Sequence, residues 1–490
     1  MRTAPGAHDC SGYHSTMRFL VSLLAAPLIA AAHADTLPDL GDSSQTVLST
    51  QQERQLGESI MRQIRASKHY LDDPEIGDYI NGLGYRLVAH SPDADQAFEF
   101  FLVDDQSINA FALPGGFIGV HTGLIVSSES ESELAAVLAH EVAHVTQRHI
   151  ARLFQQQKQA GIASIAAMAL AILAARSSPD LANAALAGAQ YATVQTQLNF
   201  SRDNEREADR VGVQVLERSG LDPRAMPSFL ERLQRAYRLY ETNAPSYVRT
   251  HPLTYERIAD VQNRVEGMPY RQVPDTLEFR LVRARLQVRA SDPRDAVERF
   301  EDILREKKTV NETAARYGLV LALLEAKQLQ RARRELAEFE RDAADDPMVL
   351  ALAAQVRKAS GDTKGALALY ADAVRRYPRR RALIYEYAQS LLDARRPQDA
   401  LELITDAIRA LPPDARLYRL QAQSHAALGQ HLQQHRAQAE AYLLMGSLPA
   451  AIEQLQIGLK SGDGDYYQLS SAEARLRELR ALDQEARRKQ

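Results

Sequence analysis

A repeat of small residues every 34 positions in the C-terminal half constrains the fold of this chain more than any other feature. The matching positions form four columns: Ala354, Ala388 and Ala422; Ala366 and Ala400; Ala373, Ala407 and Ala441; Pro378 and Pro412. A small side chain at a fixed place in each repeat lets two helices pack closely, and the proline ends the second helix. The pattern therefore predicts stacked helix pairs rather than one central core.

The period and these positions resemble the tetratricopeptide repeat (TPR). The resemblance implies an all-α TPR solenoid over residues 271–490, whose concave face would bind peptides or other proteins. A plain helical bundle is the alternative, but it does not require four columns with one spacing. Because 490 residues are enough for two folded units, residues 35–270 are expected to form a separate domain.

The N-terminal domain contains two histidines four residues apart, His140 and His144, with Glu141 directly after the first. Positions i and i+4 of a helix share a face, so the two imidazoles can bind one Zn²⁺. Glu141 can take a proton from the attacking water, the general-base role in metalloprotease chemistry. A capping box at Ser130 predicts the start of this helix, and the apolar spacing continues to about Phe154. The pair is therefore expected in the middle of one long helix.

Two histidines leave a catalytic zinc one protein ligand short, and a later acidic segment supplies the candidates. Glu205 and Asp209 are four residues apart and share a helix face. Glu205 is predicted to be the third ligand, and Asp209 to accept a hydrogen bond from the other ring nitrogen of a ligand histidine. Glu207 points away from that face and is expected to be solvated. The alternative interpretation is a charged surface helix, which would be the default without the histidines.

The order His140-Glu141-x-x-His144, then Glu205-x-x-x-Asp209, resembles the M48 zinc metallopeptidases. The resemblance implies an α+β zincin-type metallopeptidase domain that is mostly helical with a small β-sheet. It also implies one Zn²⁺ per chain, with His140, His144 and Glu205 as ligands and Glu141 as the catalytic base.

The segment before the histidine helix has aromatic and β-branched runs around a Pro-Gly-Gly turn, which predicts a small sheet. Within it, Asn109-Ala110-Phe111-Ala112-x-Pro114-Gly115-Gly116 resembles the M48 segment that supplies an edge strand. By that resemblance Asn109, Ala110 and Phe111 would bind an extended substrate by strand addition. A structural hairpin is the alternative, and the two roles are compatible.

A later stretch, His251-Pro252 followed by Arg257, resembles the M48 pattern His-Pro-x-x-x-x-Arg. By the resemblance it lies beside the active site, where His251 or Arg257 can stabilise the oxyanion as a catalytic group. His251 could instead occupy the open zinc position and silence the enzyme until a substrate or partner displaces it. The plain alternative is a helix-start histidine without catalytic duty. His149, five residues after His144, leaves the metal face and is expected to be structural.

The N-terminus has the layout of a secretory signal. A basic start at Met17-Arg18 precedes an apolar stretch, and Ala32-His33-Ala34 fits the small-x-small cleavage rule. Residues 1–34 are therefore predicted to be a signal peptide, with Met17 as an alternative start; a retained membrane anchor is the other interpretation. Cleavage would remove Cys10, the only cysteine, so the mature chain would have no disulfide, which suits the periplasm.

Residues 162–175 are strongly apolar and rich in alanine. They could form a buried helix near the active site, a helix in peripheral contact with a membrane, or a membrane span. A span needs roughly 20 residues, so the packed helix is favoured and membrane contact is the second choice.

The net charge of −4, from 59 Lys and Arg against 63 Asp and Glu, argues against nucleic-acid binding.

The motifs together predict a periplasmic zinc-dependent endopeptidase. The combination of export signal, M48 domain and TPR array resembles M48 members of the Gram-negative periplasm. That resemblance implies unfolded or stalled outer-membrane protein substrates, contact with the β-barrel assembly machinery through the TPR domain, and a chaperone-like role beside degradation of misassembled proteins. There are two alternatives. One is a TPR scaffold or chaperone with a latent zinc site, which an intact Glu141 disfavours, and the other is a membrane-anchored protease.

Overall fold

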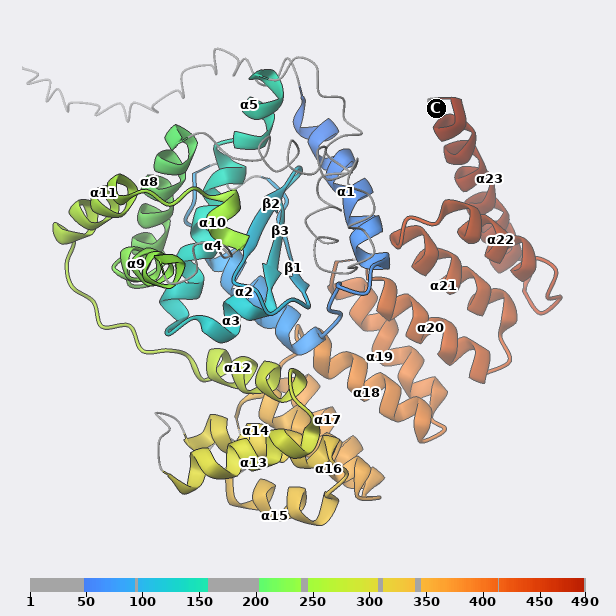
Figure 1. Ribbon diagram of the computed structural model, residues 1–490. Coiled ribbons are helices and arrows are strands. Elements are labelled where there is room, and N and C mark those ends of the chain that lie inside the picture. Colours follow the sequence, from blue (N-terminus) through green and yellow to red (C-terminus); the bar gives the residue numbers. More distant parts are fainter. Residues whose placement is uncertain are drawn as a thin grey trace, which may run out of the picture. The chain divides into compact units, whose positions relative to one another are not determined.

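Three short strands and the helices around them hold the candidate site residues (Figure 1). The computed structural model describes residues 48–92, 96–156, 202–238, 246–306, 312–339, 345–412 and 414–488. The predicted signal peptide, residues 1–34, and the apolar stretch 162–175 lie outside the described residues. Within the described ranges, no helix has the length and apolar character needed to cross a membrane.

The N-terminal half begins with capped helices. Ser49 and Gln52 form a capping box at the start of the first helix, and Asp73 accepts hydrogen bonds from two backbone N–H groups at the start of the second. The elements in chain order are α1 (Thr50–Ala66), α2 (Pro74–Val88), β1 (Glu99–Val103), β2 (Ala110–Leu113), β3 (Phe117–His121), α3 (Thr122–Ser127), α4 (Glu131–Thr146), α5 (His149–Gln156), α8 (Arg202–Arg218), α9 (Ala225–Arg238), α10 (Ser246–Thr250) and α11 (Tyr255–Glu266).

The sheet has the strand order β1-β3-β2, with β3 parallel to β1 and antiparallel to β2. The predicted turn Pro114-Gly115-Gly116 joins β2 to β3, and both glycines have positive φ angles, 78° and 84°. Residues with a side chain rarely adopt such angles, so the two glycines make the tight turn possible. The order leaves β2 at an edge, and no described strand pairs with its outer side.

Alternate strand side chains enter two different apolar clusters, as the two-residue period of a strand requires. Phe101, Phe111 and Phe117 pack against α1, whereas Phe100 and Ile118 belong to the cluster that contains α2 and α4. The sheet is therefore covered on both faces, and α4 is in contact with the edge strand β2.

Helix α4, which contains the His-Glu-Val-Ala-His motif, is buried along its whole length. It begins after Ser130, whose hydroxyl accepts a hydrogen bond from the backbone N–H of Glu133 at 3.2 Å. Helix α8 packs along it. Gly212 permits this close approach, because a Cβ at that position would lie only 3.3 Å from the backbone nitrogen of His140.

The prediction of one helix continuing to about Phe154 was wrong. Helix α4 ends at Thr146, and two residues separate it from α5. Arg148 has a left-handed φ of 53°, and its guanidinium donates to the carbonyl of Leu48 and pairs with Glu53. Neither Gln nor Arg is a helix breaker, so no local preference indicates the turn. The result is that His144 lies in the last turn of α4.

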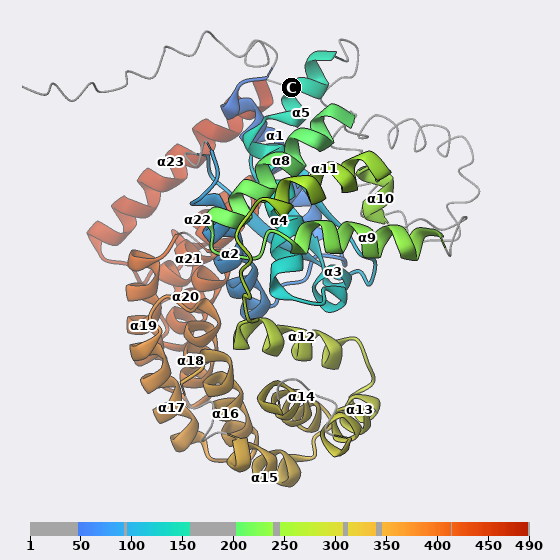
Figure 2. The same cartoon turned by 90° about the vertical axis from the view of Figure 1, so that its left-hand side faces the viewer.

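The C-terminal half is a row of helices that lie side by side along the array (Figure 2). They are α12 (Leu277–Arg289), α13 (Pro293–Arg305), α14 (Glu312–Glu325), α15 (Leu329–Phe339), α16 (Pro347–Ala359), α17 (Thr363–Arg376), α18 (Arg381–Asp393), α19 (Pro397–Ala410), α20 (Ala415–Ala427), α21 (His431–Leu444), α22 (Leu448–Gly458) and α23 (Tyr466–Arg488). The alanines of the 34-residue repeat are buried, and Pro378 and Pro412 follow the ends of α17 and α19. The predicted fold class, an α+β domain followed by an all-α repeat array, is confirmed.

The repeats and the sheet domain share one apolar cluster. It extends from Ile76 on α2 through Phe279 on α12 to Val349 on α16. Polar contacts cross the same junction, because Glu131 accepts hydrogen bonds from the backbone N–H and the hydroxyl of Thr276, at 3.0 and 2.9 Å. The boundary predicted between residues 270 and 271 falls in the helix-free stretch between α11 and α12.

Glu75, at the start of α2, is expected to make the stability pH-dependent. Burial raises the pKa of its carboxyl to about 8, although Arg285 opposes the shift. An unfolded glutamate titrates near about 4.3, so between these values the folded chain keeps a proton that the unfolded chain loses. Stability therefore falls as the pH rises through this window. Glu75→Gln stays neutral, and we expect it to raise Tm near pH 8 but not near pH 4, as measured by scanning calorimetry.

Glu256 offers a matched control for this prediction. It is the second residue of α11, as Glu75 is of α2, but it is exposed. Glu256→Gln should stay within about 0.5 kcal/mol of the wild type at both pH values, as exposed substitutions usually do. An equal change for Glu75→Gln at both values would contradict the prediction, because each unit of pKa shift corresponds to about 1.4 kcal/mol between the two protonation states.

Candidate metal centre

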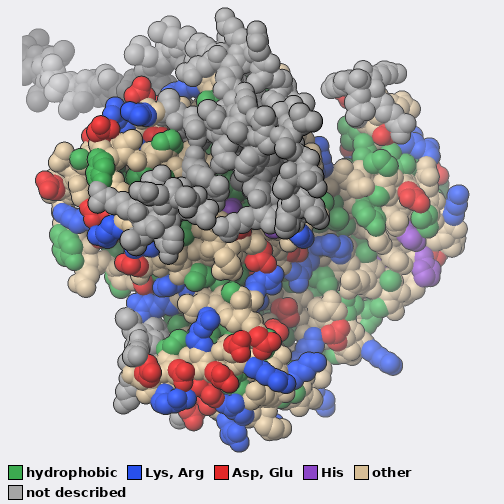
Figure 3. Space-filling view, in the orientation of Figure 1, with side chains coloured by type: hydrophobic (Ala, Val, Ile, Leu, Met, Phe, Trp, Pro, Cys, Tyr) green, Lys and Arg blue, Asp and Glu red, His purple; other side chains and the backbone are tan. Residues whose placement is uncertain are grey.

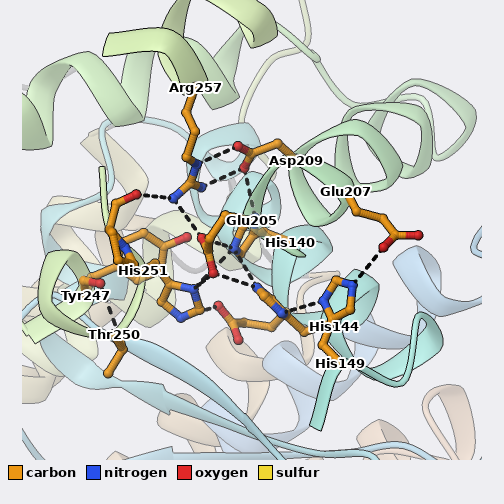
Figure 4. Close-up of polar contacts among 12 residues, drawn as sticks. His140, His144, His149, Glu205, Glu207, Asp209, Tyr247, Thr250, His251 and Arg257 are labelled. Carbon is orange, nitrogen blue, oxygen red and sulfur yellow. Dashed lines mark hydrogen bonds and ion pairs between the residues drawn. The ribbon is translucent and has the colours of Figure 1, made fainter. Parts of the chain in front are cut away.

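Four separate elements bring the candidate residues to one place (Figure 4). Helix α4 carries the histidine pair with Glu141, and α8 carries Glu205 and Asp209. His251 directly follows the short helix α10, and Arg257 lies in the first turn of α11. The positions on α4 and α8 follow from helical spacing, whereas the approach of α10 and α11 depends on tertiary packing.

One group of donor atoms meets within 4.8 Å, from His140, His144, Glu205 and His251. The Nε2 atoms of the two α4 histidines are 3.0 Å apart. Each of them lies 3.4 Å from one carboxylate oxygen of Glu205. All four side chains are buried, so the polar atoms face one another away from water.

His251 joins this group through Nδ1, which lies 3.1 Å from Oε1 of Glu205 and 3.3 Å from Nε2 of His140. The ring of Tyr247 stacks on it, with the centroids 4.7 Å apart and the planes at 26°. The sequence left three roles open for His251. The structure places its Nδ1 among the candidate ligand atoms and its Nε2 3.4 Å from Oε1 of Glu141.

Glu141 is fully buried, and His251 is its ion-pair contact in the cluster. Burial raises the pKa of this carboxyl, while His251 and His140 nearby oppose the shift. A buried carboxyl with a perturbed pKa beside a group of metal donors is a candidate catalytic residue.

Asp209 and Arg257 contact the candidate ligands His140 and Glu205 and hold their side chains in place. Oδ1 of Asp209 lies 3.0 Å from Nδ1 of His140, the contact that the sequence predicted for a ligand histidine. The guanidinium of Arg257 donates two hydrogen bonds of 2.8 Å to Asp209 and pairs with Oε2 of Glu205 at 2.7 Å. Because Arg257 is only 1% exposed and also donates to the Pro252 carbonyl, it anchors both carboxylates and the backbone beside His251.

The charges of the cluster are strongly coupled. Burial would raise the pKa of Glu205, but the nearby His251 and Arg257 hold it well below its usual value. Burial alone would lower the pKa of His140, yet hydrogen bonds to Asp209 and Glu205 raise it to about 10. Burial lowers the pKa of His144 well below its usual value. A divalent cation entering the cluster would therefore meet ionised carboxylates and displace a proton from His140.

Two residues lie closer to the cluster than the sequence suggested. Nδ1 of His149 is 2.9 Å from Nδ1 of His144, and its Nε2 is 3.2 Å from Oε2 of Glu207. Glu207 also accepts a hydrogen bond from Arg152 at 2.9 Å, and with 29% of its side chain exposed it is partly solvated, as expected, while being paired. Burial lowers the pKa of His149 to about 4, against the opposing effect of Glu207. The turn at Arg148, for which the sequence has no signal, causes the difference.

The predicted substrate strand is the edge strand β2. Ala110 and Phe111 lie in β2, and the buried Asn109 directly precedes it. Phe111 faces α1, whereas Ala110 belongs to the cluster of α4. Because one side of β2 has no described partner strand, its backbone can accept an extended peptide.

The donor set suits zinc. Imidazole nitrogens and a carboxylate oxygen are the common ligands of Zn²⁺, and three such protein ligands leave one position open in catalytic sites. His140, His144 and Glu205 supply those three donors, and Asp209 holds one of the rings, as ligating histidines require.

Comparison with known proteins matches residues 78–265 to Peptidase family M48 and residues 287–356 and 358–424 to the Tetratricopeptide repeat. The Beta-barrel assembly-enhancing protease of Escherichia coli (strain K12) is 37% identical over 465 residues, 94% of each chain. The Putative beta-barrel assembly-enhancing protease of Vibrio cholerae is 33% identical, over 90% of this chain and 92% of its own. Mitochondrial metalloendopeptidase OMA1 of Schizosaccharomyces pombe is 32% identical over 195 residues, 40% of this chain and 54% of its own. The resemblances to the M48 metallopeptidases and to the tetratricopeptide repeat are confirmed.

Proposed function

Because the chain belongs to peptidase family M48, together with the beta-barrel assembly-enhancing proteases, we propose that it degrades unfolded or stalled outer-membrane β-barrel proteins in the periplasm. The protein is a zinc metalloendopeptidase with TPR repeats. One observation carries the proposal: a buried group of metal donors adjoins the buried carboxyl of Glu141, and the helix that carries Glu141 contacts the edge strand β2.

The residues divide the chemistry among them. His140, His144 and Glu205 would hold the zinc, which when bound polarises the scissile carbonyl and acidifies the attacking water. Glu141 takes a proton from that water and passes it to the leaving amine. The burial that raises the pKa of Glu141 makes its carboxylate a better proton acceptor.

Substrate selection by strand addition supports the choice of substrate. A peptide that adds to the outer side of β2, along Asn109, Ala110 and Phe111, must be extended and must have unpaired backbone groups. A β-barrel precursor that has not closed exposes such strands, whereas a closed barrel has no free edge. The edge strand thus favours unfolded chains with strand-forming sequences.

The TPR repeats mediate contacts with other proteins, and we propose that they bind the β-barrel assembly machinery and support a chaperone-like role. Figure 3 shows acidic and basic side chains interspersed over the lower part of this face. In the repeats, Arg316 on α14 pairs with Glu312 on the same helix and with Glu335 and Glu338 on α15. Export through residues 1–34 completes the proposal and rests on the sequence, which for residues 162–175 favours a packed helix and ranks peripheral membrane contact second.

The substrate class can be tested with three proteins. A urea-unfolded outer-membrane β-barrel protein, the same barrel folded in detergent and an unfolded soluble protein of similar length would each be diluted into the zinc-loaded enzyme. We expect the unfolded barrel protein to be cleaved fastest and the folded barrel to resist. Equal cleavage of the soluble protein would reject the barrel preference. Bound zinc without cleavage of any substrate would instead favour the TPR scaffold with a latent zinc site.

His251 is proposed to restrain the resting enzyme. Its Nδ1 lies among the donor atoms and its Nε2 approaches Glu141, so the ring lies where substrate and water must enter. His251→Ala is therefore expected to raise kcat/KM for casein several-fold while the other ligands keep the zinc. The oxyanion role predicts the opposite sign, a loss of about 10²-fold or more, since removing one such donor has that effect in other proteases. The direction of the change decides between the two roles.

A further inference from the structure

Each of the two histidines of α4 contacts a series of polar side chains that ends in an arginine. His140 contacts Asp209, which Arg257 binds. His144 has a longer chain, in which its Nδ1 meets Nδ1 of His149 at 2.9 Å and the rings lie at 75° to each other. On the far side, Nε2 of His149 meets Glu207 at 3.2 Å, and Glu207 accepts from Arg152 at 2.9 Å.

The backbone is shaped to make this second chain. In an unbroken helix, a residue five positions after His144 would lie about 140° around the axis from it. The left-handed Arg148 breaks the helix and returns His149 to His144, where it is fully buried. Such a conformation is unfavourable for a residue with a side chain, and it persists because the contacts of Arg148 with Leu48 and Glu53 hold it.

The hydrogen bonds of this chain suit a His144 that binds a metal through Nε2 and therefore carries its hydrogen on Nδ1. The carboxylate of Glu207 only accepts, so Nε2 of His149 carries the hydrogen of that bond. Nδ1 of a neutral His149 is then an acceptor and receives the Nδ1–H of His144. That leaves the lone pair of His144 on Nε2, the atom that lies in the donor cluster.

We propose that His149 and Glu207 are positioning residues for the metal: through two successive hydrogen bonds they fix the tautomer and the ring orientation in which His144 binds it. The proposal rests on the metal site of the proposed function. It gives a role to Glu207, which points away from Glu205 and Asp209 on α8 and pairs with His149 and Arg152. It also assigns a task to the strained turn between α4 and α5.

The test is the zinc dissociation constant of the full-length mature protein, measured by competition with a chelator. His149→Phe keeps a ring but removes the acceptor, and we expect a 10–100-fold weaker affinity, the usual loss when an outer partner of a ligand is removed. His149→Asn places an oxygen close to the position of Nδ1 and should restore most of the affinity. His121→Phe is the control, because His121 is equally buried but outside the donor cluster, and it should lower Tm without changing the zinc affinity.

Nitrogen-15 chemical shifts provide an independent measurement. In the zinc-loaded wild type we expect the shifts of a histidine pair in which Nδ1 of His144 and Nε2 of His149 carry hydrogen. If His149→Phe does not fold, Glu207→Met decides, since it leaves both histidines in place. It should weaken zinc binding more than Glu207→Gln, whose amide oxygen can still accept from His149.

The outcomes separate this inference from the proposed function. A wild type that binds no zinc would overturn both the metal site and everything built on it. A wild type that binds zinc, with His149→Phe and Glu207→Met within about threefold of its affinity, would overturn the positioning role alone. A fall in Tm without a change in zinc affinity would likewise show that His149 only packs.

Discussion

Glu141→Gln should abolish peptide hydrolysis, lowering kcat by about 10²–10⁴-fold, while zinc content and fold stay as in the wild type. The amide has the shape of the carboxyl but cannot accept the proton. The substitution keeps the side-chain volume and weakens one described contact, that of Oε1 with Nε2 of His251 at 3.4 Å. Casein hydrolysis, metal analysis and Tm measured on the same preparation would check the three parts of this prediction.

Glu133→Gln is the matched control on the same helix. Glu133 lies in the first turn of α4, where it accepts a hydrogen bond from the backbone N–H of Glu129 at 2.7 Å and pairs with Arg232. Its substitution should lower Tm and leave kcat unchanged. If Glu141→Gln kept more than a tenth of the wild-type kcat, another group would have to be the base. Assistance to barrel assembly that survives Glu141→Gln would assign that activity to the repeats.

Arg257→Met is expected to have the largest effect on stability, about 3–5 kcal/mol in the free energy of unfolding. It removes the guanidinium that pairs with Glu205 and Asp209 and leaves two buried carboxylates without the counter-charge that they share. We also expect zinc affinity to fall 10–100-fold, because Asp209 would no longer be held against His140. Chemical denaturation and chelator competition measure the two effects separately.

Arg264→Met is the comparison for this prediction. Arg264 is on the same helix, α11, and pairs with Asp260 at 2.9 Å, but both side chains are 39% exposed. Such a pair contributes about 0–1 kcal/mol, so the variant should be close to the wild type. The stability of Arg257→Lys should fall between those of the two Met variants. Lysine keeps the charge but loses the planar guanidinium that donates two hydrogen bonds to Asp209. Equal free energies of unfolding for Arg257→Met and Arg264→Met would contradict the stabilising role of Arg257.

The parts of the site that could be predicted from the sequence are those with helical spacing. His140 and His144 share a face of α4, as Glu205 and Asp209 share a face of α8, because i and i+4 positions do so in any helix. The pairing of α4 with α8 then brings both faces together. The sheet, the Pro-Gly-Gly turn and the repeat helices likewise follow from local signals.

Tertiary contacts determine the rest. The ring of His251 is placed by stacking on Tyr247 and by the approach of α10, neither of which a local pattern encodes. The sequence therefore left three roles open for this residue. His149 was assigned to packing because an unbroken helix would carry it away from His144. The long-range contact between Arg148 and Glu53 reverses that geometry.

The apolar cluster shared by α2, α12 and α16 has a consequence for biogenesis. Helix α2 is made early in translation, but its apolar partner α12 follows only after residues 89–276 have been made. Until then the part of the chain that carries the histidine motif exposes apolar surface and lacks part of its core. Proteolytic competence should thus arise only in chains that have received their first repeats, so prematurely ended chains would be misfolded proteins rather than uncontrolled proteases.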